Sequence, residues 1–274
     1  MSIITISRDS YSNGKEVAVK AAEILGYKCL NEEVFEAASK QYNVPGQKLI
    51  QVFHELPSFF GDSVKTLKNY IAYVQSAFTG FLVKDNLIYY GPAGHFLIQG
   101  VSHVLKVRII ANTDDRIKTR MNRENTTEKE AIKYITKDVR KEKKWAKLMF
   151  GVDGSDPSFY DLLINTSQID ISNAVQIIVD TVNSKKFQPM TYSKKCMENY
   201  DLSSRVRALL IEIDPEIRVR SESGDVYIYT KAHSRTIEKN TSIIKQKIEG
   251  LEGVKSVNIH VTEDVFQNMA GTMR

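Results

Sequence analysis

The chain has 274 residues, of which 42% are hydrophobic and 26% are charged, and its formal net charge is +5. This length and composition fit a soluble protein with a full hydrophobic core and room for two domains. No run approaches the roughly 18 consecutive apolar residues of a membrane span, and the N-terminus lacks a signal-peptide pattern. We therefore expect no membrane span and a cytoplasmic location.

The chain opens with an apolar strand at residues 2–7, a loop, and a helix at 15–25 that ends at Gly26. In a G-x-x-x-x-G-K-[ST] loop, backbone N–H groups surround phosphates and the Lys neutralises charge. Gly14 and Lys15 fit that pattern, whereas Asp9 takes the place of the first Gly and Glu16 that of the Ser/Thr. The loop therefore predicts phosphate binding, with an ordinary strand–turn–helix and an exposed Lys as the alternative.

Two other features of this opening segment bear on the prediction. Asn13 tolerates a positive φ, so a tight turn is feasible there, whereas Tyr11 and Asp9 have no such freedom. Arg8 either reaches a phosphate or caps the end of the strand. We leave both roles of Arg8 open.

Helices and strands then alternate. The patterns predict helices at 32–41, 47–54, 63–81 and 171–182, the start of a helix at 94–98, strands at 86–91, 104–110 and 162–165, and one long basic helix after Asp114. Alternation of this kind predicts an α/β fold, with a parallel sheet covered by helices on both faces.

Positive charge is concentrated between residues 116 and 147, where twelve basic residues stand against five acidic ones. Such a run suits polyphosphate or nucleic acid, although a solvated helical face explains any single Lys. Within it, Trp145 is expected to pack against the core. The five histidines show no spacing that favours catalysis.

The two cysteines, Cys29 and Cys196, have no companion Cys or His at metal-ligand spacing. We predict reduced thiols and no metal site built from protein side chains.

The pattern breaks off at residues 183–199, which we interpret as a linker. Beyond it we predict a helix at 203–212, strands at 217–222 and 226–231, a helix at 234–249 and a strand at 254–261. These elements form a small α+β module of the order αββαβ at 200–262, followed by a tail at 263–274.

Residues 3–182 resemble the cytidylate kinase-like family, a branch of the nucleoside monophosphate kinases. The match rests on these motifs: Ile6-Ser7-Arg8, Gly14-Lys15-Glu16, Leu25-Gly26-Tyr27, Gly91, Asp156-Pro157-Ser158, Tyr160-Asp161 and Asn165-Thr166-Ser167. The resemblance implies a P-loop NTPase-type core, a substrate-binding region, a mobile lid, and the use of ATP and Mg²⁺.

The resemblance also implies roles for individual residues. It places these residues at ATP: Arg8, Ser12, Asn13, Gly14, Lys15, Glu16 and Arg116. It gives catalytic roles, several of them in a closing lid, to Lys15, Arg120, Arg123, Asp138 and Lys141. Asp138 and Lys141 have the alternative of a simple intrahelical ion pair.

The sequence departs from the family pattern at three places. The family's Asp-Arg-Glu falls on Asn31, Glu32 and Glu33, and the Arg that usually follows Gly91 is Pro92. In the lid, Lys141 replaces an Arg and so keeps the charge without the bidentate fork.

Residues 200–262 resemble a BON domain through Val206 and Leu210, the turn at 223–228, and the segment 253–257. We expect this module to bind a protein or a small ligand, because it shows no strongly basic apolar face for a membrane.

Two hypotheses of function follow. The first is an ATP-dependent kinase whose nucleotide substrate resembles CMP. The second is a catalytically impaired nucleotide sensor that keeps the kinase fold and signals through the C-terminal module. Nucleic-acid binding is a weaker third option, because no RNA-reading motif accompanies the positive charge.

Overall fold

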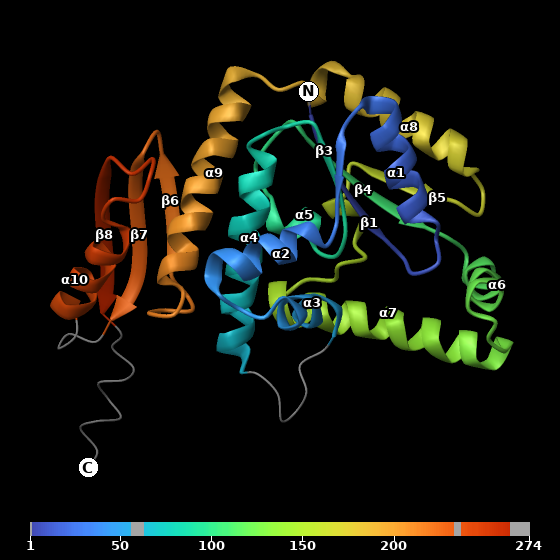
Figure 1. The fold of residues 1–274 in the computed structure, drawn as a ribbon, viewed down its shortest axis with the longest axis horizontal. Helices are drawn as coiled ribbons and strands as arrows, with labels where there is room; N and C mark the ends of the chain where they lie inside the picture. The colour runs from blue at the N-terminus through green and yellow to red at the C-terminus, as the bar shows by residue number, and fades with distance from the viewer. Residues whose placement is uncertain (1, 56–62, 233–236, 264–274) are drawn as a thin grey trace, which may run out of the picture.

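The computed structural model describes residues 2–55, 63–232 and 237–263 (Figure 1). Its larger part contains a five-stranded sheet in the order β2-β3-β1-β4-β5, in which every neighbouring pair is parallel. The strands are β1 (Ile3–Arg8), β2 (Lys28–Leu30), β3 (Leu87–Tyr90), β4 (Val104–Ile110) and β5 (Leu162–Asn165). The predicted parallel α/β sheet is therefore confirmed, with the three-residue strand β2 as an addition.

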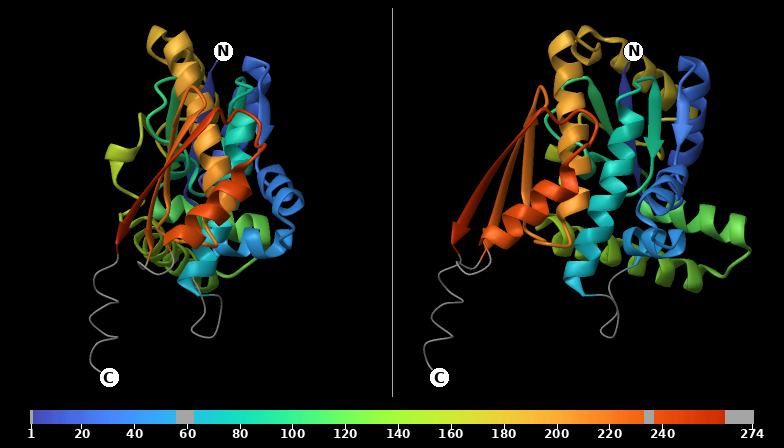
Figure 2. Two further views of the ribbon diagram at one scale, coloured as in Figure 1. Left: turned by 90° about the vertical axis from the view of Figure 1, so that its left-hand side faces the viewer. Right: turned by 60° about the vertical axis from the view of Figure 1, so that its left-hand side comes forward.

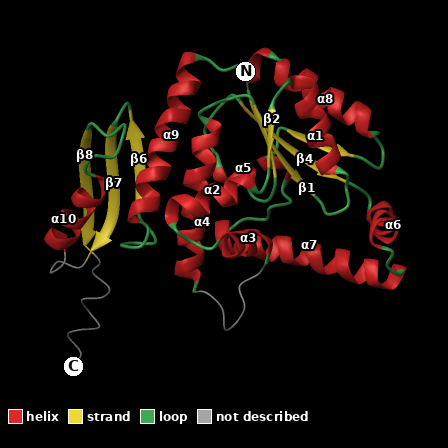
Figure 3. Ribbon diagram, viewed as in Figure 1, coloured by secondary structure: helices red, strands yellow, loops and turns green. Residues whose placement is uncertain are grey.

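Helices cover both faces of this sheet (Figure 3). Ile4 and Ile88 pack on one face against α1 (Gly14–Leu25) and α8 (Ile171–Asn183). Successive strand residues point to opposite faces, and Ile3 and Leu87 accordingly belong to the core on the other face. That second core is built with α2 (Glu33–Tyr42), α3 (Gly46–His54), α4 (Val64–Leu82) and the short α5 (Gly94–Leu97).

The predicted single basic helix is two helices, α6 (Thr113–Glu124) and α7 (Glu128–Phe150). The break arises because Asn125 takes a left-handed φ of 51° and Thr127 starts α7 with a capping box to Glu130. In Figure 1, α7 crosses the carboxyl ends of the central strands. Trp145 of α7 is 6% exposed and donates from Nε1 to the Val52 carbonyl at 2.6 Å, so its predicted place in the core is confirmed.

Residues 191–199, predicted as part of a linker, instead form the first half of α9 (Thr191–Leu210). α9 lies between α4 and the small C-terminal sheet (Figure 2). Thr79 of α4 donates to Asp201 of α9 at 2.9 Å, and Tyr73 shares an apolar cluster with Val206. Within the segment itself, Met197 packs in the core that α4 shares, and the Asn199 carbonyl accepts from Ser221 of the C-terminal sheet at 2.6 Å, so partners on two sides support the helix. Before it, the chain makes short 3-10 turns at Pro157–Phe159 and Lys185–Phe187.

The C-terminal module has the predicted αββαβ order, with α9 as its first helix. β6 (Arg218–Glu222), β7 (Asp225–Ala232) and β8 (Ser256–Glu263) follow, with α10 (Ile237–Ile248) between the last two. The pair β6–β7 is antiparallel and the pair β7–β8 is parallel. The first residues of the helix predicted at 234–249, and the tail after residue 263, lie outside the described residues. No helix in the described part of the chain has the length and apolar character to cross a bilayer.

Candidate active site

The loop between β1 and α1 is held in a strained backbone conformation. Asn13 takes a φ of 60°, as its residue type allows, and Tyr11 takes a φ of 61°. The expectation that Tyr11 lacks this freedom is wrong. Its ring packs edge-on against Tyr134 at 5.9 Å and its hydroxyl accepts from Arg120 Nη1 at 2.5 Å, so tertiary contacts hold the conformation.

Gly14 begins α1 where only a glycine fits. A Cβ there would lie 2.7 Å from Cβ of Arg8, which covers the start of the helix. The Asn13 side chain makes no capping bond to α1 and instead accepts from Arg123 Nη2 at 2.6 Å. The Asn13 side chain therefore leaves the first-turn N–H groups uncapped, and uncapped N–H groups at a helix start are the groups that bind phosphate in other proteins.

The next two residues of α1, Lys15 and Glu16, are exposed. Glu16 pairs with Lys20 at 2.9 Å. Ser12, by contrast, is buried, and its hydroxyl lies 2.8 Å from the Asp9 carbonyl and 3.2 Å from the Ile109 carbonyl. Ser12 therefore stabilises the loop from inside, and its predicted contact with ATP has no support from this geometry.

Two further arginines of α6 approach the same loop. Arg116 is 4% exposed and donates to the Ser10 carbonyl at 2.8 Å and to Asp9 at 3.3 Å. Arg120 pairs with Glu124 at 2.9 Å and lies over the Tyr134 ring at 3.8 Å. Their charge is largely used by protein partners, so both residues hold the loop in place. Their predicted roles toward a nucleotide stay predictions.

The acidic residue at the first-glycine position has a structural use. Asp9 accepts from Nη2 of Arg108 at 2.7 Å, and the same guanidinium reaches Glu142 of α7 at 2.9 Å. Burial lowers the pKa of Arg108, but the carboxylates of Glu142 and Asp9 outweigh that effect and raise it. Arg108 thus ties the loop, β4 and α7 together. Sequence patterns did not identify it.

A buried hydrogen-bonded chain lies next to this ion pair. His95 Nδ1 is 2.8 Å from the Ser7 hydroxyl, and its Nε2 is 3.1 Å from the Tyr160 hydroxyl. Tyr160 also donates to the Gly154 carbonyl at 2.7 Å, so all these bonds are made when His95 carries its proton on Nε2. Burial, with the nearby charge of Arg108, lowers the pKa of His95 to about 3. The imidazole is therefore neutral.

Two pockets open at this end of the sheet. The first, which we call the loop pocket, has a volume of about 640 Å³ and is lined by these residues: Arg8, Ser10, Tyr11, Asn13, Gly14, Lys15, Glu16, Val19, Lys20, Glu23, Arg123 and Tyr134. The second, which we call the inner pocket, has a volume of about 410 Å³. Arg8, Ser10 and Tyr134 line both, so the two pockets adjoin.

Residues of this chain that differ from the family's sequence pattern line the inner pocket. Its walls include Asn31, Glu32 and Pro92. Asp138 and Lys141 of α7 form another part of the wall, and no ion pair joins them among the described residues. The inner pocket therefore brings Asp138 and Lys141 together with the acidic Glu32.

His54, which the sequence patterns did not single out, also lines the inner pocket. Its pKa is lowered by burial and by the charges of Lys141 and Arg8. The positive charges of Lys141 and Arg8 therefore disfavour protonation of His54 in the inner pocket. In the described part of the chain, no three His, Cys, Asp or Glu side chains are grouped as ligands for a metal ion.

Curated proteins similar to this chain include cytidylate kinases. A cytidylate kinase of Sulfolobus acidocaldarius is 31% identical over 102 residues, which cover 37% of this chain and 56% of the relative. A cytidylate kinase of Saccharolobus islandicus strain L.S.2.15 is 25% identical over 194 residues, which cover 70% of this chain and 97% of the relative. The chain thus spans only about half the length of the first of these curated relatives.

Among solved structures, an uncharacterized protein from Eubacterium ventriosum ATCC 27560 shares the fold. It superposes with a TM-score of 0.51 at 20% identity, over 68% of this chain and 100% of its own. The pattern that defines the cytidylate kinase-like family matches residues 3–168, which carry the loop, both pockets and α6–α7 but not the C-terminal module. The chain belongs to the cytidylate kinase-like family.

Proposed function

We propose that this protein is a nucleoside monophosphate kinase that transfers the γ-phosphoryl group of ATP to a cytidylate-like nucleotide. The observation that carries the proposal is the pair of adjoining pockets that meet at Arg8. One pocket contains the uncapped start of α1, and the other lies against α7. A kinase needs two such neighbouring sites, one for each nucleotide.

The residues of the loop pocket fit a nucleotide triphosphate. The first-turn N–H groups of α1 are not capped by Asn13, and Lys15 and Arg123 add positive charge. For Mg²⁺, the pocket offers the carboxylates of Glu16 and Glu23. Mg²⁺ takes oxygen ligands, keeps several waters and is bound through one or two carboxylates together with substrate phosphates, so this donor set is compatible with it.

The contribution of the protein to such a reaction is positioning and charge. Phosphoryl transfer needs little covalent help from side chains, because charge spreads over the oxygens of the group in transfer. Arg8 lines both pockets and is placed to neutralise that charge. Lys141 and Asp138 would orient the acceptor nucleotide from α7, with α7 and α6 forming the lid.

An ADP-release assay with CMP, dCMP and UMP tests the proposal. Wild-type protein should release ADP from ATP and Mg²⁺ when an acceptor is present. The Lys15→Ala variant should lose about 100-fold or more in kcat, because one cationic contact can be worth that much. Lys40→Ala, which removes an exposed Lys of α2 that lines neither pocket, should lose far less. The absence of ADP release with all three acceptors would overturn the proposal.

A second function has its own support. Glu32 and Pro92 stand in the inner pocket at positions where the family resemblance implies arginines. A non-catalytic nucleotide sensor would accommodate that loss of charge. Calorimetric titration with ATP and Mg²⁺ separates the two, since a sensor binds ATP without turnover and a kinase does both.

The proposal extends to the domain boundaries, the partner of the C-terminal module and the location of the protein. We propose a kinase-like domain at 1–182, a BON-like module at 200–262 with a protein or small ligand as partner, and a cytoplasmic location. The helical α9 replaces most of the predicted linker between the two domains.

A further inference from the structure

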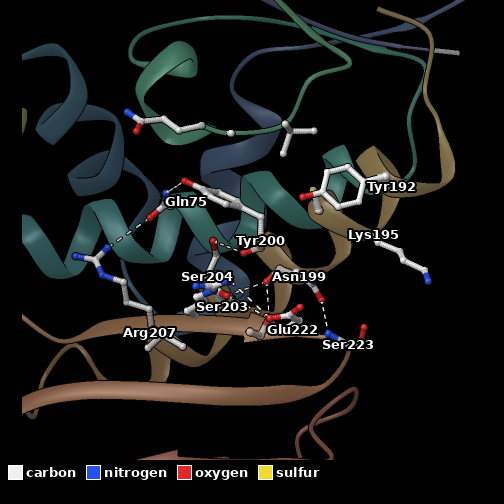
Figure 4. Close-up of a pocket in the computed structure, with 17 residues that line it drawn as sticks. Gln75, Tyr192, Lys195, Asn199, Tyr200, Ser203, Ser204, Arg207, Glu222 and Ser223 are labelled. Carbon is white, nitrogen blue, oxygen red and sulfur yellow. Dashed lines mark hydrogen bonds and ion pairs between the residues drawn. The ribbon is translucent and has the colours of Figure 1, made fainter. Parts of the chain in front are cut away.

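A third pocket lies where the C-terminal module meets the kinase-like domain (Figure 4). It has a volume of about 550 Å³, within the usual range for small-molecule sites. Its walls come from α4, from the loop that follows α5, from α9 and from β6. We call it the junction pocket. None of its lining residues belongs to the loop pocket or the inner pocket.

The junction pocket carries an excess of positive charge. Lys195, Arg207 and Arg220 line it, with Glu222 as the one carboxylate among its lining residues. Arg220 Nη2 lies 3.6 Å from Glu222 Oε2, so these two side chains form an ion pair with each other. Over the described residues, no ion pair within 4.0 Å involves Lys195 or Arg207. Two cations of the pocket therefore lack a carboxylate partner.

Arg207 is the less exposed of the two, because it is partly buried whereas Lys195 is exposed. Its Nε reaches the Ile217 carbonyl and its Nη1 reaches Gln75 Oε1, both at 3.4 Å, which are long hydrogen bonds. Burial lowers its pKa. The nearby carboxylate of Glu216 is bound by Lys68. A guanidinium has five donors, and over the described residues Arg207 makes two hydrogen bonds, both long, so it can still donate to an anion in the pocket.

The remaining walls suit an organic molecule. Tyr200 accepts from Gln75 Nε2 at 2.8 Å and donates to the Leu97 carbonyl at 3.2 Å, which fixes its ring in the wall. Val101 and Val219 add apolar surface. Figure 4 shows Tyr192 and Lys195 at the opposite end of the pocket from Arg207.

We propose that the junction pocket binds a small organic anion with a phosphate or carboxylate group, and that Arg207 is its main charge partner. Lys195 and Arg220 assist from α9 and β6. The site is separate from the proposed kinase site, so it stands or falls independently of it.

Cys196 lines the same pocket and provides a built-in reporter. The chain has two cysteines, so Cys29→Ser leaves Cys196 as the single thiol. The rate at which neutral iodoacetamide alkylates Cys196 is measured against rising concentrations of ribose 5-phosphate, inorganic phosphate and citrate. At least one probe should slow alkylation about fivefold or more, with saturation. The strongest probe identifies which anionic group is preferred.

Three further variants in the Cys29→Ser background test the residues. Arg207→Met should abolish protection, and Arg207→Lys should keep part of it. Lys195→Met, at an exposed position where a folding defect is not expected, should raise the half-saturating concentration about threefold. Lys247→Met, an exposed change on α10, should have no effect. A lack of saturable protection by every probe, or equal protection in Arg207→Met and Lys195→Met, would overturn the proposal.

Discussion

Asp9 and Arg108 form an ion pair of 2.7 Å between Oδ1 and Nη2, although 99 residues separate them in the chain. Parallel pairing of β1 with β4 brings them together, since Ser7 and Arg108 are register partners. Arg116 adds a second cation at 3.3 Å from the other oxygen of Asp9. The loop that starts the kinase-like domain is therefore anchored by charge where relatives of the P-loop type carry a glycine.

Removing this carboxylate should destabilise the fold. Asp9→Asn removes one of the two carboxylates paired with Arg108 and the carboxylate paired with Arg116, and these arginines are 5% and 4% exposed. We expect a loss of about 3 kcal/mol in the free energy of unfolding, measured by urea denaturation. Glu16→Gln, which breaks an exposed pair with Lys20, should cost less than about 0.5 kcal/mol. Equal effects of the two substitutions would contradict the anchoring role of Asp9.

Gly14 is required by its contact with Arg8. In Gly14→Ala the new Cβ would meet Cβ and Cδ of Arg8 at 2.7 and 2.9 Å, so the start of α1 must shift. We expect a loss of about 1–3 kcal/mol in stability and at least tenfold weaker ATP binding by calorimetry. Gly46→Ala is the matched control, since its Cβ would meet only Ser39, at 3.7 Å. A Gly14→Ala variant that binds ATP like wild type would refute this close approach.

The two pockets should respond to different substitutions. Arg123 lines only the loop pocket, and Lys141 lines only the inner pocket. Arg123→Met should raise the Kd for ATP about tenfold, a change of about 1.4 kcal/mol, with little change for CMP. Lys141→Met should do the reverse. If each variant weakened both nucleotides equally, the assignment of donor and acceptor pockets would be wrong.

The neutral state of His95 predicts a pH effect on stability. Its pKa falls from an ordinary value of 6.5 to about 3, so the folded protein binds fewer protons than the unfolded chain between these values. Stability from this group is complete above about pH 7 and is lost as the pH falls from 6.5 towards 3. Between pH 7 and pH 5 the loss is about 2 kcal/mol.

The His95→Gln variant keeps a hydrogen-bonding side chain next to Ser7 but does not titrate. Its free energy of unfolding should therefore fall by about 2 kcal/mol less than that of wild type over the same pH interval. Chemical denaturation at pH 7 and pH 5 measures the difference. Identical pH dependence in the two proteins would show that His95 is not held neutral.

Local patterns in the sequence were sufficient for much of this fold. The β1–α1 unit and the alternation of strands with helices follow from apolar periodicity and from Gly26. The burial of Trp145 followed from the size and apolar character of its side chain. These features depend on residues that are close in sequence or on a single side chain.

Features that depend on tertiary partners were missed. α9 buries the polar side chains of Asp201 and Ser204, which obscure its apolar stripe in the sequence. Asp201 is buried because Thr79 and Arg205 donate hydrogen bonds to its carboxylate. Tyr11 takes a left-handed φ because the partners of its ring and hydroxyl come from α6 and α7. No local pattern contains the information about either set of partners.

The candidate site divides in the same way. Gly14 and Lys15 were found through a contiguous motif, and the structure places both in the loop pocket. Arg108, His95 and Tyr160 are far apart in the sequence, and the tertiary fold brings them together. A signal was present in β4, whose sequence is apolar apart from Lys106 and Arg108, since a charge within a buried strand requires partners.

The most direct test of the proposed kinase activity follows the phosphoryl group itself. Wild-type protein is incubated with ATP labelled at its γ-phosphate, Mg²⁺ and CMP, and the products are separated. We predict that the label appears in CDP, and that Lys15→Ala reduces its rate of appearance about 100-fold or more. Label that stays in ATP, or appears only as inorganic phosphate, with each of CMP, dCMP and UMP would contradict the assignment as a nucleoside monophosphate kinase.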